Sequence, residues 1–88
     1  MVLDHPYELH PQVSIRPEPF GALAYHFGNR RLSFLRSPDI VDVVTTLADH
    51  GSVAEALTAA GVDARRWPSF QNALAALETS EMIRERAD

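Results

Sequence analysis

The stretch Leu23–Leu35, with the sequence LAYHFGNRRLSFL, decides the predicted fold because it reads as two strands joined by a tight turn. Gly28 and Asn29 predict a two-residue turn, since glycine readily adopts the positive φ that a tight hairpin requires. Any such turn fixes which residues face each other across the hairpin. The resulting register pairs Phe27 with Arg30, Tyr25 with Leu32, and Leu23 with Phe34.

This register separates the side chains into two distinct faces. The large apolar side chains gather on one face of the hairpin. A slip of one residue would mix the two faces, so the hydrophobic pattern and the turn predict the same pairing. The other face holds Ala22, Ala24, His26, Arg31, Ser33 and Leu35.

The second strand of the hairpin, residues 31–36, is predicted to be an open edge because nothing after it reads as a strand. An open edge offers unpaired backbone groups to an extended peptide. We expect Leu35→Pro to remove one edge donor and to impair such binding. The alternative is an edge that the flanking arginines merely protect from aggregation.

The segments around the hairpin complete the sheet. Residues 1–12 contain two prolines, and their apolar residues follow no helix or strand periodicity, so they are predicted to be an irregular tail. Apolar and polar side chains alternate over residues 13–16, which predicts a short strand. Pro17 and Pro19 end this strand. Three strands with short connections predict an antiparallel meander.

Three helices are predicted after the sheet. Ser37-Pro38-Asp39 is typical of a helix start, and Gly51 ends that helix. The sequence from Ser52 to Glu55 matches a capping box and begins a second helix. A third helix begins between residues 63 and 68 and ends near residue 79. We therefore predict an α+β, winged-helix-like fold, with a three-stranded antiparallel sheet and then three helices in a domain of residues 13–84, followed by a frayed end at 85–88.

Composition excludes several classes of protein. The 88 residues fit one domain, and 45% of them are apolar. There is no cysteine, no apolar run that could cross a bilayer and no signal peptide, so we expect a cytoplasmic protein without a membrane role. The net charge of −4 argues against general nucleic-acid binding, although all eight basic residues are arginine, which favours forked recognition of carboxylates.

No catalytic or metal-binding residues are predicted. The four histidines are scattered along the chain, without the convergent spacing that zinc requires. The acidic residues of the first helix, Asp39, Asp42 and Asp49, read as solvated groups. The serines do not lie in the sequence motifs that are typical of an activated nucleophile, so an enzyme is the least favoured class of protein.

Two aromatic residues near the third helix belong either to the core or to a groove beside the helix. Phe70 is best explained as a core residue, whereas Trp67 either fills the core or covers one end of a groove between the last strand and the last helix. Arg31, Ser33 and Leu35 point to the same side of the strand. A peptide added there could place side chains between sheet and helix.

Three stretches carry a resemblance to a known family: residues 10–13, residues 16–22, and the hairpin with Tyr25-His26-Phe27 and residues 31–35. They resemble the mycofactocin biosynthesis chaperones. More broadly, the layout is similar to that of the RiPP recognition elements, typified by pyrroloquinoline quinone biosynthesis protein D. The resemblance covers nearly the whole chain and is most specific between residues 13 and 35.

The resemblance implies a peptide chaperone that has no catalysis or cofactor of its own. Such proteins hold the leader of a ribosomally made precursor as an added strand, in the cleft between the third strand and the third helix. They present it to a radical S-adenosylmethionine maturase, which supplies the iron–sulfur clusters and acts on the C-terminal valine and tyrosine of the precursor. Carried onto this chain, the resemblance implies a peptide site of Arg31, Leu32, Ser33, Phe34, Leu35 and Arg36 on the strand, with Trp67, Phe70, Gln71 and Leu74 on the helix.

A DNA-binding winged-helix regulator is the alternative. Arg65 and Arg66 would then introduce a recognition helix, and Gly28-Asn29 would form the tip of the wing. The acidic net charge and the early position of the hairpin weigh against this function.

Overall fold

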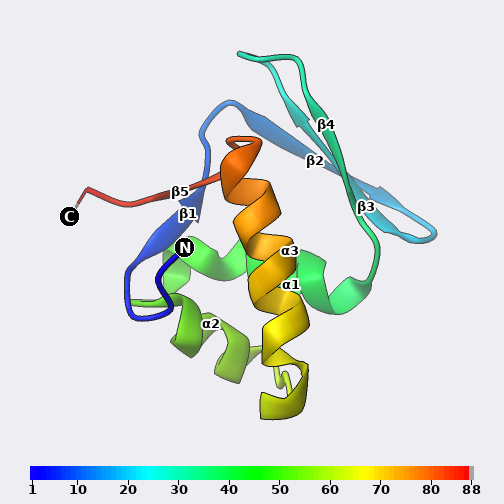
Figure 1. Cartoon of the computed structure of the whole chain (residues 1–88). Coiled ribbons are helices and arrows are strands. Elements are labelled where there is room, and N and C mark those ends of the chain that lie inside the picture. The colour runs from blue at the N-terminus through cyan, green and yellow to red at the C-terminus, as the bar shows by residue number, and fades with distance from the viewer. Residues whose placement is uncertain (88) are drawn as a thin grey trace.

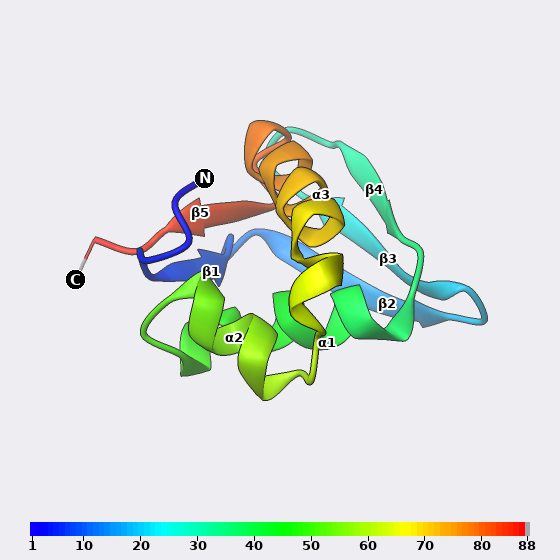
Figure 2. The same ribbon diagram turned by 60° about the horizontal axis from the view of Figure 1, so that its bottom comes forward.

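The computed structural model describes residues 1–87 and shows an α+β fold, as predicted (Figure 1). Two sheets flank α3: β1 and β5 pair on one side of it, and β2, β3 and β4 form the meander on the other (Figures 1 and 2). Two short 3₁₀ turns, Leu47–Asp49 and Ala64–Arg66, connect the helices. The elements are β1 (Tyr7–Leu9), β2 (Val13–Glu18), β3 (Gly21–His26), β4 (Leu32–Leu35), α1 (Pro38–Thr46), α2 (Val53–Ala59), α3 (Trp67–Thr79) and β5 (Ile83–Glu85).

The predicted register of the hairpin is confirmed in the strands. Tyr25 lies opposite Leu32 and Leu23 lies opposite Phe34 in the antiparallel pair of β3 and β4. The sheet order is β2-β3-β4, so β3 is the central strand and β4 is an edge, as the sequence predicted.

The turn itself differs from the prediction. The chain reverses over Phe27–Arg30, and the residue with positive φ is Arg30, at 63°, rather than Gly28. The buried His26 holds this turn, because its Nδ1 accepts hydrogen bonds from the backbone N–H groups of Gly28 (3.0 Å) and Asn29 (3.1 Å). A Cβ at Gly28 would lie 2.9 Å from Cε1 of the buried His26 ring, so close approach favours glycine here.

The tail is more ordered than the sequence indicated. Residues 1–12, predicted to be irregular, contain β1, which pairs with β5 near the other end of the chain. The predicted fraying at 85–88 is likewise wrong for Glu85, which lies in β5, and for Arg86, whose backbone N–H donates to Pro6 O (2.9 Å). Residue 88 lies outside the described residues.

Ion pairs and hydrogen bonds hold this two-stranded ribbon. Arg84 Nε lies 2.7 Å from Glu8 Oε2, and His5 contacts Glu85. Burial raises the pKa of Tyr7, so its hydroxyl stays protonated and donates to Glu78 Oε2 (3.4 Å). The tail is therefore fixed to β5 and α3, away from β4.

The predicted helix starts are confirmed in their chemistry. Ser37 Oγ accepts from Ile40 N (3.3 Å) at the start of α1. At the start of α2, Ser52 Oγ accepts from Glu55 N (3.1 Å), and Glu55 Oε2 accepts in return from Gly51 N (2.9 Å). This reciprocal pair satisfies backbone donors that a helix start otherwise leaves free.

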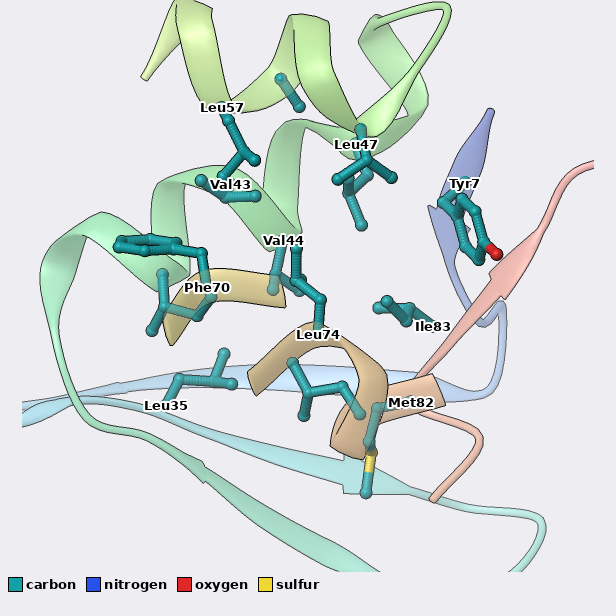
Figure 3. Close-up of a cluster of buried hydrophobic side chains, with 14 of the residues drawn as sticks. Tyr7, Leu35, Val43, Val44, Leu47, Leu57, Phe70, Leu74, Met82 and Ile83 are labelled. Carbon is teal, nitrogen blue, oxygen red and sulfur yellow. The ribbon is translucent and has the colours of Figure 1, made fainter. Parts of the chain in front are cut away.

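The core lies between the β2-β3-β4 sheet and the three helices (Figure 3). From the sheet, the small Ala22 and Ala24 and the larger Leu35 face inward, and all three are buried. The helices supply the bulk of the core, and Figure 3 shows Leu35 facing Phe70. The sheet therefore turns Ala22, Ala24 and Leu35 toward the helices, whereas Leu32 and Phe34 on β4 stay exposed on the other face.

Candidate functional site

The free edge of β4 is the first component of the site. His26 N donates to Arg31 O (3.0 Å), so the carbonyl of Arg31 points toward β3, while its N–H donates to Asn29 Oδ1 (2.9 Å). Because paired and unpaired positions alternate along an antiparallel ladder, the backbone groups of Ser33 and Leu35 also point toward β3. The backbone N–H and C=O groups of Leu32 and Phe34 therefore face away from β3. Within residues 1–87, no other strand pairs with this edge.

A groove lies between this edge strand and α3. Its volume is about 600 Å³, and its walls come from β4, the start of α1 and one face of α3. Leu35, Ile40, Phe70 and Leu77 give it an apolar floor that is continuous with the core. The lining residues are Leu32, Ser33, Phe34, Leu35, Arg36, Ser37, Ile40, Arg66, Ser69, Phe70, Ala73, Ala76, Leu77 and Ser80.

Small side chains on α3 keep the groove open. Ser69, Ala73, Ala76 and Ser80 recur at intervals of three or four residues, so they share the helix face that looks toward β4. Ala73 and Ala76 are exposed, whereas Leu74 and Leu77 beside them are buried. A larger residue at either alanine would fill the space in which a guest chain would lie.

Two arginines border the groove. The Arg66 guanidinium lies 2.9 Å from Asp39 Oδ2 and 5.2 Å from the centre of the Phe70 ring, so it is held in place and its charge is matched. Arg36 lies over the Phe34 ring at 5.7 Å. The groove therefore combines an apolar floor, serine hydroxyls and positively charged borders, which suits an extended peptide better than a small polar molecule.

The structure brings together most but not all of the residues that the sequence predicted for the site. Five strand residues, Leu32 through Arg36, line the groove, and Phe70 lines it from α3. Leu74 is fully buried in the core, and Trp67 donates its indole N–H to Val62 O (3.0 Å). Neither of these residues lines the groove, nor do Arg31 and Gln71.

Most of the groove residues on α3 that were not predicted from the sequence share one signal. The helix side of the groove was expected to consist of large residues. Most of it instead consists of the small residues Ser69, Ala73, Ala76 and Ser80, which we call the small stripe. Small residues at helical spacing on a face that lacks large apolar groups could have indicated a surface kept open. Ser37, Ile40 and Arg66 carry no comparable signal, because only the packing of α1 against α3 brings them to the groove.

The described residues offer little support for the other classes of function. No group of three or more histidines, cysteines or carboxylates within residues 1–87 could hold a metal ion. The proposed recognition helix, α3, has neither arginine nor lysine from Trp67 to Thr79, and Arg65 and Arg66 before it lie beside Asp63 and Asp39. Among the described helices, none has the length and apolar character needed to cross a membrane.

Comparisons with known proteins agree on one family. The model of the peptide chaperone MftB family matches residues 6–84. Over 80 residues, or 91% of this chain, the sequence is 51% identical to the peptide chaperone MftB of Mycobacterium ulcerans and 50% identical to that of Mycobacterium tuberculosis, covering 73% of each relative. It is also 50% identical to the Mycolicibacterium smegmatis protein of the same name, covering 78% of it. No solved structure gave a significant match.

Proposed function

This chain belongs to the peptide chaperone MftB family, and we propose that it binds the leader of a ribosomally made precursor peptide by strand addition and presents that precursor to a radical S-adenosylmethionine maturase in mycofactocin biosynthesis. In this proposal the chaperone acts in the cytoplasm, performs no catalysis and holds no cofactor. The observation that carries the proposal is an unpaired strand edge that borders an apolar groove.

The edge supplies the affinity in this proposal. A leader strand laid along β4 receives hydrogen bonds from the N–H groups of Leu32 and Phe34 and donates its own to their carbonyl oxygens. Each such bond contributes about 0.5–1.5 kcal/mol once the lost hydration is subtracted. Because the backbone carries these bonds, the edge can hold different leader sequences.

The groove supplies the selectivity. Side chains of an added strand alternate between its two faces, so every second leader residue points between β4 and α3. There it meets Leu35, Phe70 and the small stripe of α3. Apolar leader residues therefore fit these positions, while a carboxylate fits near Arg36 at the border.

Isothermal titration calorimetry with the synthetic leader tests the proposal. The informative variant is Ala76→Phe, which places a ring in the groove from an exposed position of α3. We expect it to weaken leader binding at least about tenfold with little change in stability, because the loss of about 1.4 kcal/mol corresponds to one or two edge hydrogen bonds.

The matched control is Asn72→Phe, which adds the same ring to an exposed position of α3 outside the groove. It should leave leader affinity within about twofold of wild type. If the wild-type chain does not bind the leader, with or without the maturase, the proposed function is wrong. If Asn72→Phe and Ala76→Phe weaken binding equally, the leader binds elsewhere.

A further inference from the structure

The outer face of the β2-β3-β4 sheet, which meets the groove only at Leu32 and Phe34 on its β4 edge, carries an apolar surface. Leu32 and Phe34 on β4 are 56% and 57% exposed, and Phe27 beyond β3 is 57% exposed. Leu23 and Tyr25 lie between them on the central strand, opposite Phe34 and Leu32. Phe20 joins the surface through an edge-on contact with the Phe34 ring, with their centres 5.8 Å apart. We call these six residues the outer patch.

Folding gives no reason for an outer patch of this size. A sheet with one face on the core usually presents polar residues on the other face. Here the central strand β3 turns Ala22 and Ala24 inward, and Leu32 and Phe34 on β4 stay more than half exposed on the outer face. Clustered apolar side chains that stay exposed are typical of a surface that another molecule covers.

The charge around the outer patch identifies the chemistry of that molecule. Residues 13–36 contain four arginines and a single carboxylate, Glu18, so this segment carries a charge of +3 in a chain whose net charge is −4. Arg16 lies opposite Leu23 with its side chain 77% exposed and its Nε 3.2 Å from Glu18 Oε1, and Arg36 covers one side of Phe34. A shallow hollow bounded by Phe20, Phe34 and Arg36 can receive an anchoring side chain.

We infer that the outer patch docks a separate protein surface that has an apolar centre and an acidic border. This inference rests on the proposed function, in which the docked protein is the maturase that receives the peptide. A second copy of the chain fits less well, because a symmetric pairing of two such faces sets arginines against arginines. An acidic border on the partner instead matches the net charge of +3 that residues 13–36 carry, Arg36 included.

Docking at the outer patch is linked to peptide binding because both involve strand β4. Leu32 and Phe34 contribute their side chains to the outer patch and their unpaired backbone groups to the free edge. A leader strand added to β4 widens the sheet, and every second leader side chain then lies beside Phe34 on the outer face. The docked partner thus contacts sheet and leader together, so the loaded chaperone is expected to bind the partner more tightly than the empty one.

The test measures maturase and leader affinity separately for one variant. Phe20→Ser combined with Phe27→Ser removes two exposed rings of the outer patch that lie outside β4 and do not line the groove. We expect maturase affinity to fall at least tenfold in biolayer interferometry, while leader affinity in calorimetry stays within twofold. Arg16→Glu should also weaken maturase binding, and this loss should shrink as salt is raised.

The outcomes separate this inference from the proposed function. If the wild-type chain binds leader and maturase and both variants do so equally well, the outer patch is not the docking surface and the inference is overturned. If the wild-type chain binds neither molecule, the proposed function itself fails. If light scattering shows a dimer that the serine variant abolishes, the occupant is a second copy, which also overturns the inference.

Discussion

The two edges of the same three-stranded sheet are built differently. Phe27 N donates to Gln12 O (2.8 Å), and the alternation that follows along β2 places Pro17 where a backbone N–H would face away from β3. Proline there removes the donor from the exposed edge, which is a common way to prevent unwanted strand pairing. The opposite edge, on β4, keeps both outward donors at Leu32 and Phe34 and borders a groove. The β2 edge therefore offers only Ile15 as a free donor, because Pro17 has no N–H and Val13 N donates to His10 O (2.9 Å), whereas the β4 edge keeps two donors beside a groove.

The largest expected effect comes from proline at two neighbouring positions of β4. Leu35 is buried and directs its backbone toward β3, so Leu35→Pro should cost more than about 3 kcal/mol of stability through a lost ladder bond and lost packing. Phe34 is exposed with its N–H on the free side, so Phe34→Pro should cost less than about 1 kcal/mol. Urea unfolding followed by circular dichroism measures both values.

This pair corrects the expectation that Leu35→Pro removes an edge donor. The outward donors belong to Leu32 and Phe34, because the turn places Arg31, Ser33 and Leu35 on the paired side. Equal losses of stability for the two proline variants would contradict the assignment of the free edge.

The next effect concerns leader affinity at the two edges. Phe34→Pro should weaken leader binding about tenfold, because the added strand loses a hydrogen-bond donor and meets a proline ring. Pro17→Val restores a donor to the opposite edge and should leave leader affinity unchanged. Calorimetry on both variants checks this, and a gain of affinity in Pro17→Val would show that the leader uses β2 instead.

A smaller effect is expected from charge along the open edge. Arg36 lines the groove, whereas Arg31 lies at the hairpin end outside it. For an acidic peptide, Arg36→Glu should therefore weaken binding up to about fivefold, and Arg31→Glu should weaken it less, since exposed pairs contribute about 0.2–1 kcal/mol. Measuring both affinities at two salt concentrations checks the order, and a larger loss for Arg31→Glu would move the site toward the hairpin tip.

The smallest expected effect is a pH dependence of the stability, caused by a histidine near the β2 edge of the sheet. Burial, the neighbouring His26 and Arg84 lower the pKa of His10, which lies just before β2. His10 therefore binds a proton more readily in the unfolded chain than in the folded one. The free energy of unfolding decreases as pH falls below about 6.5, and the loss is complete below the pKa that His10 has in the folded state.

His10→Gln should flatten this decrease, while leader affinity at the other edge should be unaffected by the substitution. Urea midpoints of wild type and variant between pH 7.5 and pH 5 measure the difference. An identical pH profile for both proteins would show that His10 is not responsible.

The sequence allowed the meander, the strand register and the open edge to be predicted, because alternation and a nearby turn are local signals. It did not identify the residues of the turn, since the turn is held by hydrogen bonds from Gly28 N and Asn29 N to the His26 side chain. It also missed β1 and β5, two strands of three residues each, whose pairing joins residues more than seventy positions apart.

The candidate site shows the same division between local and long-range signals. The strand side, Leu32 to Arg36, could be predicted because β-structure alternates and the edge is local. The helix side depends on how α3 rotates against the sheet, which turns Leu74 into the core and Ala73 and Ala76 toward β4. That rotation is set by packing against α1 and the sheet, so Trp67, Gln71 and Leu74 were expected at a groove that they do not line.

Amide hydrogen exchange across β4, followed by NMR with and without the leader, tests the open edge most directly. In the free protein, the amides of Leu32 and Phe34 should exchange fast, whereas those of Ser33 and Leu35, bonded to β3, should be protected. Leader binding should slow exchange at Leu32 and Phe34 and leave their two neighbours nearly unchanged. A leader that binds while the Leu32 and Phe34 amides continue to exchange fast would contradict strand addition at this edge.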